Sequence, residues 1–122
     1  MNILITGITG LFGSQLAKEF SKLGKIHGLK RDHSSLELLQ DLDFEIHWHQ
    51  GDIFDVDALL SALIGIDLVI HSAGLVSFLS RDRERLFEVN TIGTANLVNA
   101  MLSAGVGKLV HVSSVAAIGR SP

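Results

Sequence analysis

The residues with the clearest chemical potential are three glycines near the start of the chain, spaced three apart in TGITGLFG. Gly7, Gly10 and Gly13 follow a short apolar run and open a helical pattern. Glycines in this position let the backbone turn sharply and approach a phosphate, and the helix that follows supplies amides, here near Leu11 and Phe12. The spacing differs from G-x-G-x-x-G, so the placement between strand and helix carries the prediction of a pyrophosphate site.

Polar or small residues also follow the later apolar runs. Lys30-Arg31-Asp32 follows the second run, where an arginine accommodates a 2′-phosphate and an acid binds the ribose. The two basic residues come first and favour the phosphate, with a solvated strand exit as the alternative. In Gly51-Asp52-Ile53, the carboxylate can accept a hydrogen bond from an adenine amino group or serve a turn or helix cap.

Small residues and histidines mark the remaining strand ends. His71-Ser72-Ala73-Gly74 would let a cofactor lie against bare backbone, or would serve packing alone. We interpret His71 and His111 as hydrogen-bonded structural histidines. His47 and His49 alternate on a strand and share a face, as two metal ligands might, but no third ligand is apparent nearby, and we assign no metal site.

Strand-like apolar runs alternate with helical patterns from end to end. Strands are predicted at Asn2–Thr6, Lys25–Arg31, Phe44–Gln50, Asp67–Ala73 and Lys108–Ser113; helices are predicted at Gly13–Leu23, Ser34–Leu42, Asp55–Ile64 and Arg83–Ala104, with Asp55 as a cap and Gly24, Gly65 and Gly105 as stops. The alternation predicts one α/β domain over residues 1–122, a Rossmann-like, doubly wound parallel sheet in the order 3-2-1-4-5. Ligands bind such sheets outside the carboxyl ends of the strands. Gly93, inside the last helix, needs a packing or functional reason.

The composition excludes several classes of function. The 122 residues carry a formal net charge of −3 and no cysteine, so no disulfide or thiolate metal site can form. A negative net charge gives no general attraction to nucleic acid or to anionic membranes. No apolar run approaches the length of a membrane span. We expect a soluble, cytoplasmic protein.

Five motifs in order make the pattern recognisable: TGITGLFG, GDIFD, HSAG, NTIGTANLVNA and KLVHVSSVAAIG. Their order and spacing resemble the short-chain dehydrogenase/reductase superfamily, in particular its extended branch, the epimerase/dehydratase group. HSAGLVSF is similar to the dihydroflavonol-reductase and 3β-hydroxysteroid-dehydrogenase-like members. The resemblance covers essentially the whole chain.

The resemblance implies hydride transfer between the nicotinamide of NADP, or alternatively NAD, and an oxygen-bearing carbon of a small-molecule substrate. Ser114 would be catalytic and hydrogen-bond the substrate oxygen, whereas Ser113 is its neighbour. The implied cofactor site comprises Gly7, Thr9, Gly10, Leu11, Phe12, Gly13, Arg31, Asp52, Ile53, Ser72, Ala73, Gly74 and Asn90. Within it the glycines line the pyrophosphate, Arg31 meets the 2′-phosphate, Asp52 and Ile53 bracket the adenine, and Ala73 and Gly74 back the ribose. Asn90 would have a structural or proton-relay role.

The chain departs from the family pattern after the serine. The family's proton donor is a tyrosine followed four residues later by a lysine, and this chain has no tyrosine. We therefore expect a Rossmann domain truncated after the fifth strand, without the C-terminal substrate-binding region and inactive as it stands. A non-catalytic dinucleotide-binding or redox-sensing module is the alternative. Lys108–Ser113 would then be an uncovered edge strand, from which we expect either self-association into a homo-oligomer or marginal stability.

Overall fold

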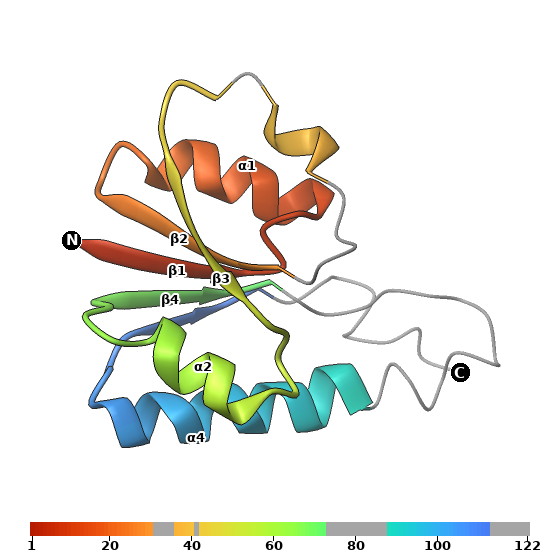
Figure 1. The fold of residues 1–122 in the computed structure, drawn as a ribbon, viewed down its shortest axis with the longest axis vertical. Coiled ribbons are helices and arrows are strands. Elements are labelled where there is room, and N and C mark those ends of the chain that lie inside the picture. Colours follow the sequence, from red (N-terminus) through yellow and green to blue (C-terminus); the bar gives the residue numbers. More distant parts are fainter. Residues whose placement is uncertain (31–35, 41, 73–87, 113–122) are drawn as a thin grey trace, which may run out of the picture.

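A single five-stranded sheet organises the chain (Figure 1). The computed structural model describes residues 1–30, 36–40, 42–72 and 88–112. The strands are β1 (Asn2–Thr6), β2 (Lys25–Lys30), β3 (Ile46–Gln50), β4 (Leu68–His71) and β5 (Leu109–His111). All neighbouring strands pair in parallel, in the order β3-β2-β1-β4-β5. This order confirms the predicted doubly wound Rossmann-like topology.

Helices cover both faces of the sheet. Helix α1 (Leu11–Phe20) lies on one face, and α2 (Val56–Ala62) and α4 (Thr94–Ala104) lie on the other (Figure 1). A π-helical turn, η3 (Glu88–Gly93), leads directly into α4. The predicted helix over Arg83–Ala104 is thus α-helical only from Thr94 within the described residues, and positions 83–87 lie outside them.

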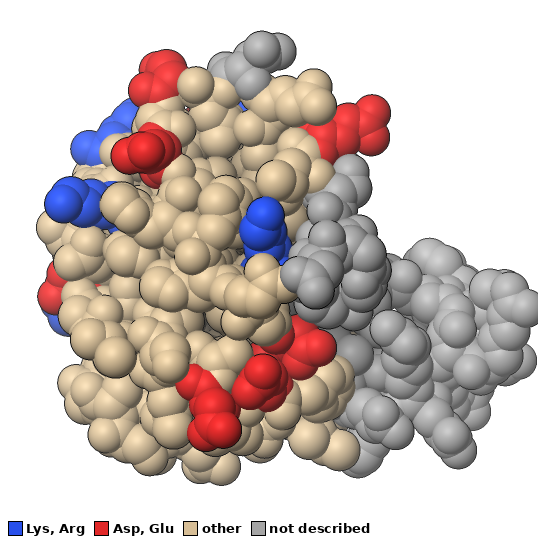
Figure 2. All heavy atoms as spheres, viewed as in Figure 1, with Lys and Arg blue, Asp and Glu red and all other residues tan. Residues whose placement is uncertain are grey.

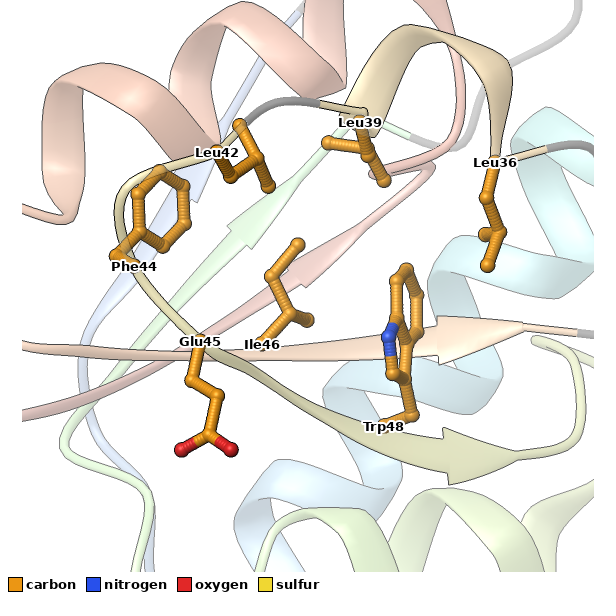
Figure 3. Close-up of a pocket in the computed structure, with 7 residues that line it drawn as sticks. All are labelled: Leu36, Leu39, Leu42, Phe44, Glu45, Ile46 and Trp48. Carbon is orange, nitrogen blue, oxygen red and sulfur yellow. The ribbon is translucent and has the colours of Figure 1, made fainter.

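The predicted helix over Ser34–Leu42 is wrong for the described part of that segment. Only a single 3₁₀ turn forms there, η1 (Glu37–Leu39), and it ends at Gln40, whose backbone is extended. Leucines occur at positions 36, 39 and 42, and a spacing of three matches the three residues per turn of a 3₁₀ helix. Figure 3 shows these leucines beside β3, where they line a cavity of about 340 Å³ with Phe44, Glu45, Ile46 and Trp48.

The sheet is most deeply buried at β1 and β4. Side chains of β1 alternate between the faces, so that Leu4 belongs to the core beneath α2 and α4 whereas Ile3 and Ile5 belong to the core beneath α1. In β4, Val69 and Ile70 divide in the same way and are both fully buried. Each such side chain contributes about 1.5–3 kcal/mol when fully buried. The strongly apolar runs in the sequence are therefore the strands with a helix layer on both sides.

The helix ends confirm two predicted stops and correct one. The Asp55 side chain accepts a hydrogen bond from the Ala58 amide at 3.1 Å and caps α2. Gly65 and Gly105 follow α2 and α4 with φ values of 74° and 76°, the left-handed conformation that glycine adopts without penalty. Gly24 does not cap α1, which already ends at Phe20. A Cβ at Gly24 would instead overlap the Met1 carbonyl, so glycine is required there by close packing.

The two outer strands are less protected. All three residues of β5, the last strand in the sheet order, are exposed, including the apolar Leu109 and Val110. Self-association stays a prediction. On the face drawn in Figure 2, several acidic side chains group in the lower part of the described surface, and a basic side chain lies near its middle. None of the helices in the described ranges is long and apolar enough to cross a membrane.

Two leucines on α4 provide a matched test of the core. Leu97 is fully buried beneath the sheet, whereas Leu102 is 73% exposed on the same helix. We expect Leu97→Ala to lower the free energy of unfolding by about 2–5 kcal/mol, because it leaves a cavity. Leu102→Ala should change it by less than about 0.5 kcal/mol. Urea unfolding followed by circular dichroism measures both, and equal losses would contradict the assigned face of α4.

Candidate functional site

The glycine-rich turn follows β1 at the carboxyl edge of the sheet. Gly7 has a φ of 67°, a conformation that residues with a Cβ rarely adopt. The Gly10 amide donates to the Gly7 carbonyl at 3.0 Å and closes the turn. The Ser14 amide then donates to the Gly10 carbonyl at 2.9 Å and begins α1. The turn predicted from TGITGLFG therefore forms between the expected strand and helix.

Gly13 brings α1 against this turn. A Cβ at position 13 would overlap the Gly7 carbonyl and would lie 2.9 Å from the Ile8 Cα, which is backbone that cannot move aside cheaply. At Gly10 the corresponding contact, with the Gly7 carbonyl, is 3.3 Å and far milder. Gly13 is thus the glycine that packing demands most strongly. Its absent side chain lets the helix begin directly beside the end of the strand.

The first turn of α1 is open to an anion. Its N-cap, Gly10, has no side chain to bond the first amides, and no acidic residue lies in the first turn. Leu11 and Phe12 are 73% and 60% exposed, although both are apolar. The first amides of a helix have no partner within the helix and carry the positive end of its dipole. The backbone amides of Leu11 and Phe12 are therefore hydrogen-bond donors from which a phosphate group can accept.

A polar network joins the ends of β1 and β4 to the start of α4. The Ser72 amide donates to Thr6 Oγ1 at 3.0 Å, and Ser72 Oγ donates to the Thr6 carbonyl at 2.6 Å. Thr6 Oγ1 lies 2.7 Å from His71 Nδ1, and His71 Nε2 lies 2.9 Å from Thr94 Oγ1. Every group has a partner when Thr6 donates to Nδ1 and Nε2–H donates to Thr94. This network confirms His71 as a hydrogen-bonded structural histidine.

The His71 ring is held neutral by its surroundings. It is 2% exposed, and burial lowers its pKa to about 4, with a smaller contribution from His111. The His111 ring stacks on it with centroids 5.1 Å apart. A neutral imidazole both donates and accepts, which the Thr6–His71–Thr94 chain requires. Protonation would remove the acceptor at Nδ1 and bury a charge.

The segment after β3 has a structural role for each predicted residue. Asp52 Oδ1 accepts a hydrogen bond from the Phe54 amide at 2.8 Å. Asp52 therefore has the turn role that the sequence offered as an alternative to adenine binding. Ile53 is 7% exposed and packs in the core beneath α2 and α4. A Cβ at Gly93 would lie 2.9 Å from Ile53 Cγ2, and Asn96 donates to the Ile53 carbonyl at 3.3 Å. Gly93 is therefore explained by the close approach of η3 to this segment.

The sheet brings only part of the predicted site together in the described residues. The ends of β2, β1 and β4 are neighbours, so Lys30, Gly7 and Ser72 share one edge of the sheet. Lys30 Nζ lies 5.4 Å from the centroid of the Trp48 ring. Asn90 is exposed in η3. The remaining predicted residues lie outside the described ranges: Arg31, Ala73, Gly74, Ser113 and Ser114.

Sequence reasoning missed Thr6 and Thr94. A threonine at the last position of β1 gives no signal by itself, because its partner depends on the pairing of β1 with β4. Thr94 reaches His71 from another element, 23 positions along the chain. The signal that was available is the histidine that ends an otherwise apolar strand, since a buried polar group needs a partner.

Comparison with known proteins identifies the family. The family model described as "NAD dependent epimerase/dehydratase family" matches residues 3–122. The chain therefore belongs to this family, a class whose fold and glycine-rich turn form a dinucleotide-binding module of oxidoreductases and epimerases.

Relatives and solved structures agree with this assignment. The chain is 36% identical to sterol demethylase protein B of Methylococcus capsulatus, over 100% of this chain and 37% of the relative. It is 32% identical to a 3 beta-hydroxysteroid dehydrogenase/Delta 5-->4-isomerase of Mycobacterium tuberculosis, over 92% of this chain and 31% of the relative. A UDP-glucose-4-epimerase structure from Stenotrophomonas maltophila, with bound NAD, has a TM-score of 0.85 at 27% identity and covers 99% of this chain and 39% of that one. The chain thus spans about a third of the length of these curated relatives.

The pKa of His71 predicts how the stability of the fold depends on pH. Its pKa is about 4 in the fold and 6.5 as the ordinary value, so below pH 6.5 the unfolded chain binds a proton that the folded chain does not. The free energy of unfolding should fall by about 2–3 kcal/mol between pH 7 and pH 4.5 from this residue alone. His71→Gln should lower stability at pH 7 and lose that part of the slope.

Urea unfolding of both proteins at pH 7, 6, 5 and 4.5 tests this expectation. The pKa values of His27 and His49 are also lowered, chiefly by burial, so they add the same slope to both proteins and cancel in the comparison. Parallel curves for the two proteins would show that His71 does not titrate as its burial requires.

Proposed function

We propose that this chain is the dinucleotide-binding part of an NAD(P)-dependent oxidoreductase or epimerase. The observation that carries the proposal is the packing of Gly13 against the Gly7 carbonyl, which opens the uncapped start of α1 beside the end of β1. A pyrophosphate needs such a place, with free amides, no side chain in the way and no negative charge nearby. Membership of the epimerase/dehydratase family supports the same assignment.

The residues present fit a nicotinamide dinucleotide. The backbone from Gly7 to Gly13, with Thr9, would hold the pyrophosphate, and the ends of β3 and β4 would flank the two nucleosides. Asp52 keeps a second carboxylate oxygen beyond the one bonded by the Phe54 amide, and this oxygen would accept from adenine. Ser72 is fixed against Thr6 and would present its backbone to the ribose. When bound, the cofactor supplies a nicotinamide ring that accepts or donates a hydride.

We assign the role of binding the substrate oxygen to Ser114. Its hydroxyl would donate to the oxygen of an alcohol or carbonyl substrate and stabilise the charge that develops there. The His71 network would contribute indirectly, because it fixes the position of the carboxyl end of β4 between β1 and α4. The 122 residues contain no tyrosine, and we assign the acid/base role to none of them. We therefore propose hydride transfer as the reaction of this class of enzyme, and we do not propose that these 122 residues catalyse it alone.

A substitution at the exposed residue Leu11 tests whether the pyrophosphate binds at the start of α1. Leu11 is 73% exposed at the first position of α1, where an acidic side chain stabilises a helix. Leu11→Glu should leave the fold intact but repel a pyrophosphate, weakening NADP or NAD binding at least about tenfold, or 1.4 kcal/mol. Leu102→Glu is the matched control, since Leu102 is equally exposed on α4.

Isothermal titration calorimetry of the three proteins with each dinucleotide measures the effect, and thermal unfolding verifies that all three are folded. Binding that is unchanged in Leu11→Glu would place the pyrophosphate elsewhere. No binding to the unaltered chain by either dinucleotide would overturn the proposed function itself.

The choice between the two dinucleotides rests on Arg31. An arginine after β2 binds a 2′-phosphate with two parallel N–H donors, so we propose that NADP binds more tightly than NAD. Arg31→Ala should erase this preference at a cost of about 1–3 kcal/mol in NADP affinity and should leave NAD affinity nearly unchanged. Lys108→Ala, on an exposed residue just before β5, is the control. Tighter binding of NAD by the unaltered protein would reverse the assignment.

A further inference from the structure

Three histidines gather on one face of the neighbouring strands β2 and β3, away from the glycine-rich turn. His27 on β2 is paired in register with His47 on β3, and His49 lies two residues further along β3 on the same face. The centroid of the His27 ring lies 4.9 Å from that of His47 and 5.4 Å from that of His49. The sequence pattern brought His47 and His49 together, and parallel pairing adds His27 from a distant segment.

Two of these rings turn nitrogen atoms toward each other. His27 Nδ1 and His49 Nε2 are 3.1 Å apart. Metal–nitrogen bonds to imidazole are about 2.0–2.1 Å long, so two such ligands of one ion lie about 2.9 Å apart in square-planar geometry and about 3.4 Å apart in tetrahedral geometry. The observed separation falls between these two values. It also allows a direct N–H···N hydrogen bond while no metal ion is bound.

The other nitrogen of His27 has the partner that a metal ligand requires. The Asn2 side-chain amide donates through Nδ2 to the Gly65 carbonyl at 3.2 Å, which turns Asn2 Oδ1 toward His27. His27 Nε2 lies 3.2 Å from that oxygen and must donate to it, because Oδ1 only accepts. His27 Nδ1 therefore keeps a lone pair directed at His49. An outer acceptor that fixes the tautomer in this way is characteristic of metal-bound histidines.

The hydrogen bond between the two rings suits the same role. Because His27 Nδ1 keeps its lone pair, the His49 ring donates to it through Nε2–H. Imidazole binds metal ions in its neutral form. Metal binding would require only that the His49 proton move to Nδ1, with no net change in protonation.

We propose that His27 Nδ1 and His49 Nε2 chelate a late first-row divalent metal ion such as Cu²⁺ or Zn²⁺. Among the described residues, no three His, Cys, Asp or Glu side chains form a group placed to hold a metal ion, so this is an open two-ligand site whose remaining positions are taken by water. The ion would clamp β2 to β3. The site lies on the middle of the sheet face and not at the carboxyl edge, so it is separate from the dinucleotide site.

Trp48 provides a direct readout of this site. It is the sole tryptophan of the chain, stands between His47 and His49 on β3 and is paired with Gly28, next to His27. Cu²⁺ binds most tightly of the divalent first-row metals at nitrogen sites and quenches indole emission nearby. Titration of the tag-free protein with Cu²⁺ should quench Trp48 with saturation at one ion per chain. Because Zn²⁺ binds nitrogen sites less tightly than Cu²⁺, Zn²⁺ added afterwards in large excess should restore the emission by competition.

Single substitutions identify the ligands. His27→Gln and His49→Gln should each weaken Cu²⁺ binding at least tenfold, and Asn2→Ala should weaken it about 10- to 100-fold through the outer partner. His111→Gln, on the exposed strand β5, is the matched control and should bind as the unaltered protein does. Electron paramagnetic resonance of the copper-loaded protein should show two nitrogen ligands, a result that does not depend on the folding of any variant.

The outcomes separate the site from adventitious binding. Quenching without saturation at one ion, or affinity unchanged in both His27→Gln and His49→Gln, overturns the proposal. Equal weakening in His111→Gln overturns it as well, since binding would then not depend on the paired rings. If the Cu²⁺ site is absent while dinucleotides still bind, only the metal inference fails, because the proposed function rests on other residues.

Discussion

The contact between Gly13 and the Gly7 carbonyl sets the geometry on which the rest of this structure depends. A helix can begin directly beside the end of β1 only where neither residue interposes a side chain. That start then places the open amides of α1 at the carboxyl edge, and its buried face, through Ala17, completes the core above Ile3 and Ile5. Packing and the opportunity for anion binding therefore come from the same absence of a Cβ.

The opposite face of the sheet is organised around a second close approach. Gly93 meets Ile53, and this contact brings η3 and α4 against the segment that follows β3. Asn96 secures the same place through the Ile53 carbonyl. The π-helical turn ends at Gly93, directly before Thr94, the residue that reaches His71. In consequence the polar network at the end of β4 and the apolar core beneath α4 depend on one helix position.

Histidine has two different uses in this sheet. His71 is buried on β4, where both ring nitrogens have hydroxyl partners and the ring stays neutral. His27 on β2 and His49 on β3 face each other in a half-buried position. In the first arrangement both ring nitrogens form hydrogen bonds, which hold β4 against β1 and α4. The second leaves a pair of nitrogens at a distance that suits either a proton or a metal ion between them.

Much of this protein is determined by local sequence. Period and composition were sufficient for the five strands, the glycine turn, the Asp55 cap and the order of the sheet, because each depends on residues close together in the chain and on the general handedness of crossovers. Local pattern failed at Ser34–Leu42, where the described residues form a 3₁₀ turn at Glu37–Leu39 and no α-helix. Helix propensity is a weak predictor that tertiary context can override.

What tertiary structure alone decided is which distant residues meet. The partners of His71 are set by the pairing of β1 with β4 and by the docking of α4, and the approach of His27 to His49 is set by the register of β2 with β3. A sequence records residue types and local spacing but no cross-strand register, and a shift of one residue in a strand turns each side chain to the other face. The glycines could therefore be assigned from the sequence, whereas Thr6, Thr94 and the paired imidazoles could be recognised only once the sheet had assembled.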